Sequence, residues 1–336
     1  MLKVNQDSYA YATGLLRARE LKLLDKNRID RMLEATKAEE AYRVLSEAEY
    51  GMDNESLKSV SDFEALLAEE MKKTYALLLE IGPHDEVVEV FQKRYDYFNV
   101  KVLLKAELSN QDVPPILLDT GLQDRDELVR IIRERDYEQL DQIMQSAIVE
   151  VYDVFSRTGD SQVIDLILDK ALYHQFYVEL KGIKNKFMNE LADIIVDITN
   201  IKMFIRLKAL NKPLEFIKKV LLEGGLIDKE LYFNNVEAPI DSFLADIEFT
   251  EYGKAIQKSI KSLDNRNIQT LEKVLDDHLM NYMTQQAKQL TIGIEPFIAF
   301  LFAKEAEIKN VRIILTGKIN GLSNDLIRER LRLVYV

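Results

Sequence analysis

Apolar residues recur at the three- and four-residue spacing of α-helices, and no sustained alternation of apolar and polar positions is present. The stretch after Ser61-Asp62 is typical: the pair can cap a helix whose apolar face carries Phe63, Leu66, Leu67 and Met71. Ser242–Leu244 is predicted to be a loop. With only 12 Gly and 6 Pro, the pattern predicts an all-α fold with long helices.

One nine-residue pattern, here called the signature, occurs three times. It consists of an acidic residue, two variable positions, Asn, a β-branched residue, a basic residue and three apolar residues. Copies one, two and three span 96–104, 197–205 and 307–315. The Asn residues lie 101 and then 110 positions apart, which exceeds the period of solenoid repeats. The chain is therefore predicted to contain three similar units, each a small helical bundle.

The signature helix is apolar most of the way round, which predicts that it is buried. A buried amide without a hydrogen-bond partner costs about 1–3 kcal/mol, so each signature Asn should have one. The acidic residue three positions earlier shares its helix face and could contribute. We interpret the polar signature residues as specifying the fold rather than binding a ligand: Asp96, Asn99, Lys101, Asp197, Asn200, Lys202, Glu307, Asn310 and Arg312.

A weaker repeat surrounds the signature. Leu23-Leu24-Asp25, Leu117-Leu118-Asp119 and Leu221-Leu222-Glu223 each precede a turn and a further helical segment. We predict helical units at 1–112, 113–212 and 213–336, the third including the C-terminal segment. By analogy with closed symmetry in oligomers, the units are expected to form a funnel with pseudo-threefold symmetry and a central cavity. Linear stacking of the units is the alternative.

The composition narrows the possible partners and locations. The chain has 336 residues, 47% of them hydrophobic, and a formal charge of −12, which disfavours nucleic acid as a partner. It has no cysteine, which excludes thiol chemistry and disulfides. The densest apolar stretch, Pro296–Ala303, is far shorter than the roughly 20 residues of a membrane helix. No signal peptide is visible, so a cytoplasmic protein without a membrane span is predicted.

The motifs of common catalytic sites are missing from the sequence. It has no Walker A loop and no GxGxxG, and His84, His174 and His278 lack the spacing of metal ligands. We therefore predict no catalytic residue, no cofactor and no metal site. His278, which follows Asp276-Asp277, is interpreted as part of a surface helix end. Arg328, Arg330 and Arg332 are interpreted as a solvated helix face, with contact to acidic partner loops or lipid headgroups as the alternative.

Three segments carry a resemblance to a known family. They are Phe91–Ala106, which contains Arg94-Tyr-Asp-Tyr-Phe-Asn99; the opening segment with Tyr9-Ala-Tyr-Ala12 and Arg17-Ala-Arg-Glu20; and Glu307–Leu322 together with Arg328–Val336. With its length and repeat plan, the chain resembles the C subunits of V-type and archaeal-type ATPases and ATP synthases, a family that includes the eukaryotic d subunit. The resemblance covers nearly the whole chain.

The resemblance implies three helical subdomains in a funnel that receives the D and F subunits of the central stalk and rests on the membrane proteolipid ring. Such a protein catalyses no reaction; it couples ATP hydrolysis or synthesis to H⁺ or Na⁺ transport. It would lie peripherally at the cytoplasmic face of the membrane. Two other classes stay open, namely a helical scaffold or adaptor without a rotary role and a helical-bundle enzyme that uses carboxylates.

Overall fold

The regular structure is helical throughout the part of the chain that the computed structural model describes, residues 2, 4–48, 50, 59–260 and 268–336. No strand occurs in these ranges. The predicted all-α fold class is therefore confirmed. Within the same ranges no helix is both long and apolar enough to cross a membrane.

The chain divides into two compact units. Compact unit one comprises 1–3, 84–200 and 214–227, and compact unit two comprises 4–83, 201–213 and 228–336. The division falls within helix α9 (Lys186–Ala209), between Asn200 and Ile201. The three sequence units at 1–112, 113–212 and 213–336 stay a prediction.

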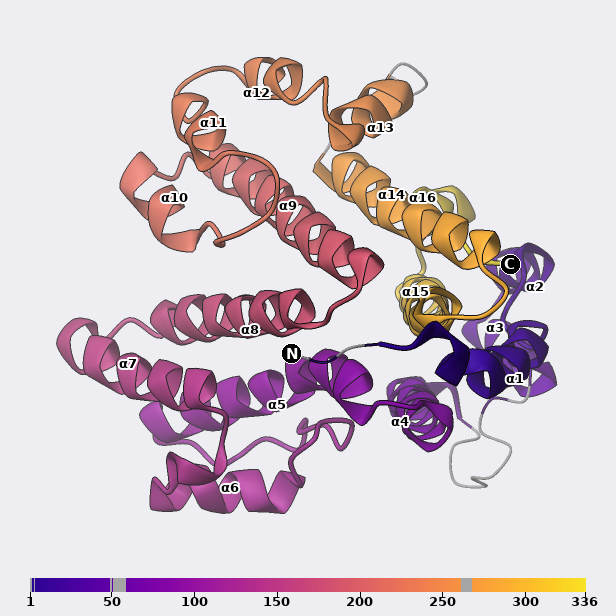
Figure 1. Ribbon diagram of the computed structural model, residues 1–336, viewed down its shortest axis with the longest axis horizontal. Coiled ribbons are helices and arrows are strands. Elements are labelled where there is room, and N and C mark those ends of the chain that lie inside the picture. Colours follow the sequence, from indigo (N-terminus) through magenta and orange to yellow (C-terminus); the bar gives the residue numbers. More distant parts are fainter. Residues whose placement is uncertain (1, 3, 49, 51–58, 261–267) are drawn as a thin grey trace. The chain divides into compact units, whose positions relative to one another are not determined.

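Compact unit one is a layered helical bundle in which α8 packs against both α5 and α7 (Figure 1). Its core includes Val100, Leu103 and Leu104 of the first signature, as expected for a helix that is apolar on most sides. Besides the first part of α9, its elements are α5 (Asp85–Leu108), α6 (Arg125–Glu134), the 3-10 helix η3 (Tyr137–Gln139), α7 (Gln142–Thr158), α8 (Gln162–Gly182) and α10 (Leu214–Val220).

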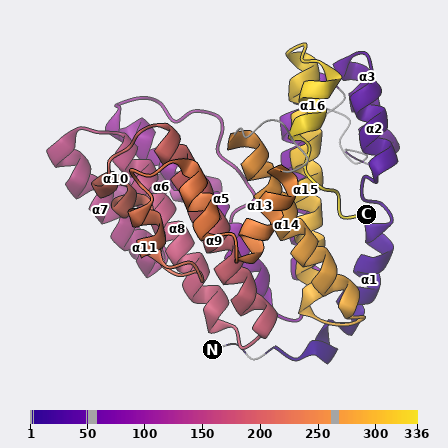
Figure 2. The same cartoon turned by 90° about the horizontal axis from the view of Figure 1, so that it is seen from above.

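Compact unit two contains α15 (Ile294–Ile319) as its central helix, which packs against α4 and α14. Around the C-terminal end of α15 lie α2, α3 and α16 (Figure 2). The other elements, besides the rest of α9, are η1 (Gln6–Tyr9), α1 (Ala10–Glu20), α2 (Lys26–Glu34), α3 (Ala38–Glu47), η2 (Val60–Asp62), α4 (Phe63–Ile81), α11 (Lys229–Asn234), α12 (Ile240–Asp246), α13 (Glu251–Ile260), α14 (Ile268–Gln289) and α16 (Asn324–Arg330).

The apolar stretch Pro296–Ala303 is buried along its whole length in the first half of α15. A helix that is apolar on all sides needs neighbours on all sides, and α1, α4 and α14 all pack on α15. The stretch is therefore the core of compact unit two.

The three signature helices, α5, α9 and α15, end in the same way. Eleven positions after the signature Asn, the chain takes a left-handed conformation, with φ of 52° at Asn110, 51° at Asn211 and 67° at Gly321. In each case the next amide donates to the carbonyl five residues back, at 2.8 Å, 3.0 Å and 2.9 Å. This is the Schellman arrangement, in which Asn and Gly are the residues that best tolerate a positive φ. The repeat seen in the sequence is thus also a repeat of backbone geometry.

One local prediction was wrong and a second was confirmed only in part. Ser242–Leu244 lies within α12, because burial of Phe243 and Leu244 outweighs the weak helix preference of Ser. Asp62 is the N-cap residue of α4, as predicted, but its side chain makes no capping hydrogen bond there. Ser59 caps the preceding 3-10 helix η2, where it accepts the amide of Ser61 and forms a capping box with Asp62.

Candidate functional site

The signature residues lie at equivalent positions on α5, α9 and α15. In all three copies the acidic residue and the Asn are buried, whereas the basic residue keeps contact with solvent. The contacts described below each lie within a single compact unit.

Each signature Asn holds one residue of a later segment by both of its backbone groups. Asn99 donates to the Leu118 carbonyl at 2.8 Å and accepts the Leu118 amide at 2.8 Å. Asn200 does the same to Leu222 at 3.2 Å and 2.8 Å, and Asn310 to Arg332 at 3.0 Å and 2.8 Å. The partner expected for each buried amide is present, and it is the backbone rather than the acidic residue of the signature.

The signature carboxylates bind the same segments further along. Asp96 accepts the amides of Leu122 at 3.0 Å and Gln123 at 3.1 Å. Asp197 accepts the amides of Leu226, at 3.0 Å and 3.1 Å, and Ile227 at 3.2 Å. In both copies these amides follow the Asn-bound residue by four and five positions. In each of these copies, the acidic residue and the Asn of the signature together fix a six-residue loop against the signature helix.

Copy three assembles this arrangement from two distant segments. Asn310 binds Arg332 near the C-terminal end of the sequence, but Glu307 accepts the amide of Leu24 and the hydroxyl of Tyr50. Lys304 lies 2.7 Å from the same carboxylate. Glutamate has one methylene more than aspartate. It can therefore reach a segment that lacks the close approach seen in the first two copies.

The basic signature residue pairs with an acidic residue of a neighbouring helix in its bundle. Lys101 lies 2.6 Å from Asp169 on α8, and Arg312 lies 2.9 Å from Glu64 on α4. Lys202 pairs with Asp276 on α14. The carboxylates of the Lys101 and Arg312 pairs are about half-exposed, so each pair contributes little to stability, about 1 kcal/mol at most.

The structure corrects the register of the weaker repeat. Asp25, Asp124 and Asp228 are the N-cap residues of α2, α6 and α11, and each accepts a backbone amide from the first turn. Leu23-Leu24-Asp25 therefore corresponds to 122–124 and 226–228, not to 117–119 and 221–223. The register predicted from the sequence was wrong because Leu-Leu-acidic triplets also contain the Asn-bound residues Leu118 and Leu222.

Glycine lies where the loop passes closest to the carboxylate. A Cβ atom on Gly121 would lie 2.0 Å from Oδ1 of Asp96, and one on Gly225 would lie 2.2 Å from Oδ1 of Asp197. Gly225 also has a φ of 82°, which disfavours other residues. These glycines explain how a short Asp side chain reaches two amides of the loop.

Replacing Gly121 with Ala is expected to lower the free energy of unfolding by about 2 kcal/mol or more. The added Cβ forces the loop away from Asp96, so the two loop amides that Asp96 accepts lose their acceptor. Gly14→Ala in α1 is the matched control. A Cβ there meets nothing within 4 Å, so a gain of about 0.5–1 kcal/mol is expected. Chemical denaturation measures both. Equal effects of the two substitutions would contradict the close approach.

Burial raises the pKa of Asp96 to about 6, against the opposing effect of the amides of Gln123 and Leu122. The pKa of Asp276 is shifted in the opposite direction. Burial alone would raise its pKa, but Lys202 and Lys309 outweigh burial and hold the pKa well below its usual range. The two carboxylates differ because one has neutral donors and the other has cations as neighbours.

Asp276 pairs with cations from three different elements. Lys202 comes from α9, Lys309 lies 2.6 Å away on α15, and Arg332 lies 2.6 Å away in the C-terminal segment. Only 18% of the Asp276 side chain is exposed. The sequence analysis missed this centre. Its only sequence signal was the position of Asp276 in a helix next to a second aspartate.

Two interpretations of charged residues were wrong. His278 lies within α14, half-buried, with its ring edge against Tyr252, rather than at a surface helix end. The three C-terminal arginines do not form one solvated helix face, since α16 ends at Arg330 and Arg332 pairs with Asp276. Arg328 is on α16 and pairs with Asp30 at 3.0 Å.

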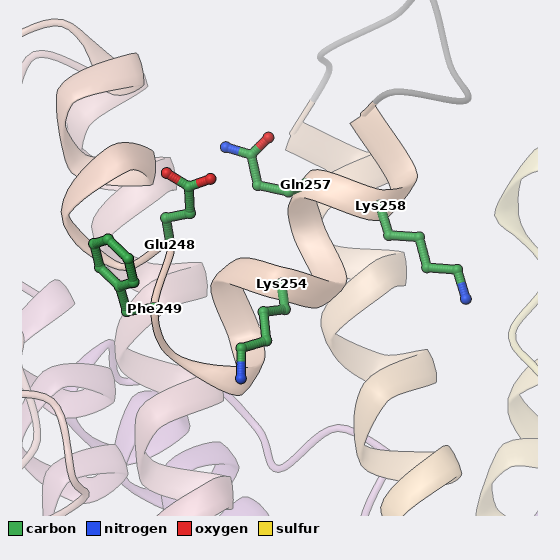
Figure 3. Close-up of a pocket in the computed structure, with 5 residues that line it drawn as sticks. All are labelled: Glu248, Phe249, Lys254, Gln257 and Lys258. Atoms are coloured by element: carbon green, nitrogen blue, oxygen red, sulfur yellow. The ribbon is translucent and has the colours of Figure 1, made fainter.

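A surface cavity of about 490 Å³ lies beside α13. Its lining residues are Glu248, Phe249, Lys254, Gln257 and Lys258, and Figure 3 shows them on α13 and on the turn before it. Lys254 is already paired with Glu251. The lining side chains include no nucleophile paired with a base, so the cavity gives no reaction class. Over the described ranges, no group of three or more His, Asp or Glu side chains is placed to hold a metal ion.

Comparison with known proteins gives one consistent result. The family model for the ATP synthase (C/AC39) subunit matches residues 12–330. The C subunit of the V-type sodium ATPase of Enterococcus hirae is 29% identical, over 97% of this chain and 99% of its own. The C subunit of the A-type ATP synthase of Methanosarcina mazei is 28% identical, over 99% and 95%, and that of Methanocaldococcus jannaschii is 25% identical, over 96% and 86%.

Proposed function

The chain belongs to the ATP synthase (C/AC39) subunit family, and from this we propose that it is the non-catalytic rotor component that joins the central stalk to the membrane ring. In this proposal it forms a socket for the D and F subunits on one side and rests on the proteolipid ring on the other. ATP hydrolysis or synthesis is thereby linked to H⁺ or Na⁺ transport. The protein lies peripherally, at the cytoplasmic face of the membrane.

The observation that carries the proposal is the triplicate anchoring of the signature helices. A part that transmits torque must resist bending, and stiffness comes from closely packed helices whose ends and loops are fixed. The buried Asn99 and Asn200 each hold a loop by two hydrogen bonds. The buried carboxylates of all three copies, Asp96, Asp197 and Glu307, bind backbone amides. This supports a mechanical role, which requires no reactive group.

We propose that the nine polar signature residues serve this stiffness by binding other segments of this chain, and that they do not contact a separate ligand molecule. We also propose the funnel with pseudo-threefold symmetry and a central cavity, formed by three units at about 1–112, 113–212 and 213–336. The common geometry of the three copies supports this proposal. The copies share the contacts of the signature Asn and the left-handed conformation at the end of the helix.

The test compares the complete ATPase complex in sealed vesicles with a complex that lacks only this protein. We expect ATP hydrolysis by the catalytic head to continue while ATP-driven ion uptake is lost. Adding the purified protein back should restore uptake, which controls for damage to the ring. Ion uptake at the full rate without it would refute the coupling role. Failure to co-purify with the stalk and the ring would indicate the scaffold class instead.

A further inference from the structure

Residues Leu331–Val336, here called the C-terminal strap, follow α16 without regular secondary structure, and the strap begins with an extended backbone at Leu331. Its residues are half-buried or exposed, and the Arg332 side chain is 15% exposed. The corresponding residues of copy two differ, because Leu221 and Leu222 are both buried. The strap is therefore attached without the hydrophobic burial that holds its counterpart in copy two.

Polar groups of three helices bind the strap instead. Asn310 of α15 binds both backbone groups of Arg332, and the Arg332 guanidinium lies 2.6 Å from Asp276 of α14. Asp277 accepts the amide of Leu333 at 2.7 Å. The Tyr335 hydroxyl donates to Glu20 of α1 at 3.0 Å. The chemistry is that of a recognition site for an extended peptide with Arg and Tyr three positions apart.

The elements next to the strap have stabilising contacts of their own. Ile327 anchors α16 in the core, directly against Gly317 of α15, and Arg328 pairs with Asp30. When the strap leaves, Asp276 keeps Lys202 and Lys309 as partners, so this carboxylate is not left unpaired. Segments held by few buried contacts open locally at much lower free energy than the core.

We propose that α1, α14 and α15 form a binding site for a peptide with Arg and Tyr three positions apart, and that the C-terminal strap occupies this site as a detachable ligand. The strap opens while the helices stay folded. Because it is tethered, its effective concentration at the site is in the millimolar range, so a free peptide cannot compete with it. Substitutions that weaken the contacts between the strap and the site leave the site vacant.

The test uses the full chain with Arg332→Ala and Leu333→Pro, which remove the contact to Asp276 and the amide that Asp277 accepts. The probe is a fluorescent peptide with the sequence of residues 331–336. We expect it to bind the double variant at least tenfold more tightly than the wild-type chain, as measured by anisotropy. A control peptide with Ala in place of Arg should bind at least tenfold more weakly to the variant.

Hydrogen exchange of the wild-type chain provides a second readout. The amides of Arg332 and Leu333 should exchange at least tenfold faster than the Leu222 amide, which is bound by Asn200 in the same way. Equal exchange rates would show that the strap opens only with global unfolding, and would overturn the proposal. So would equal peptide binding to both proteins, or loss of helical circular dichroism in the double variant.

Discussion

Replacing Asp276 with Asn is expected to lower the free energy of unfolding by about 3 kcal/mol at neutral pH. The side chain is only 18% exposed and lies among Lys202, Lys309 and Arg332. Removing one member of a largely buried charge cluster leaves the others without compensation, which typically costs about 3–5 kcal/mol. The remaining contact with solvent places the expected value at the lower end. Urea denaturation followed by circular dichroism measures it.

Asp169→Asn is the matched control, because Asp169 pairs with the basic signature residue of copy one at 2.6 Å. Its side chain is 49% exposed, so water and salt screen the pair. The expected loss is below about 1 kcal/mol. Losses of similar size at both positions would show that burial does not set the strength of these pairs.

The effect of Asp276→Asn should also depend on pH. The pKa of Asp276 is lowered in the folded chain, so its contribution is fully present above the unfolded value of about 3.9. As the pH falls below that value, the unfolded chain binds the proton first and the contribution declines. The difference between wild type and variant should therefore be constant from about pH 7 to about pH 5 and shrink below about pH 4. A difference that grows on acidification would contradict the assigned shift.

Much of the fold could be predicted from the sequence because the residue types of the signature indicate a buried helix with a polar contact. An Asn inside an otherwise apolar helix must find a partner, and three such positions occur at near-equal spacing. The family resemblance of Phe91–Ala106 and Glu307–Leu322 has the same origin, since both segments contain a signature. The family model that matches residues 12–330 confirms it.

What could not be predicted depends on contacts between distant segments. Glu307 binds Leu24, and Asn310 binds Arg332, so copy three is completed from both ends of the sequence. No spacing rule connects residue 24 to residue 307. The cluster around Asp276 was missed for the same reason, because its cations come from three elements. Sequence periodicity identifies a buried helix face but does not identify which segment covers it.

Replacing Asn200 with Ala is expected to lower the free energy of unfolding by about 3 kcal/mol or more. Leu222 is 4% exposed, so its amide and carbonyl would both lose their partner in the interior, at about 1–3 kcal/mol for each group. Asn200→Asp is expected to lower the free energy of unfolding by at least as much as Asn200→Ala. It keeps an acceptor for the amide but directs a carboxylate oxygen toward the Leu222 carbonyl. Thermal and urea unfolding measure both variants.

Asn310→Ala is the internal comparison, because the same two hydrogen bonds are lost there to Arg332. The Arg332 side chain is 15% exposed while the strap is bound. Water can replace the Asn310 amide once the strap moves. A loss of about 1 kcal/mol is expected, with faster exchange confined to the strap. If Asn310→Ala were as damaging as Asn200→Ala, the strap would be an integral part of the core. The ranking of two identical substitutions therefore separates an anchor that holds the fold from one that holds a detachable segment.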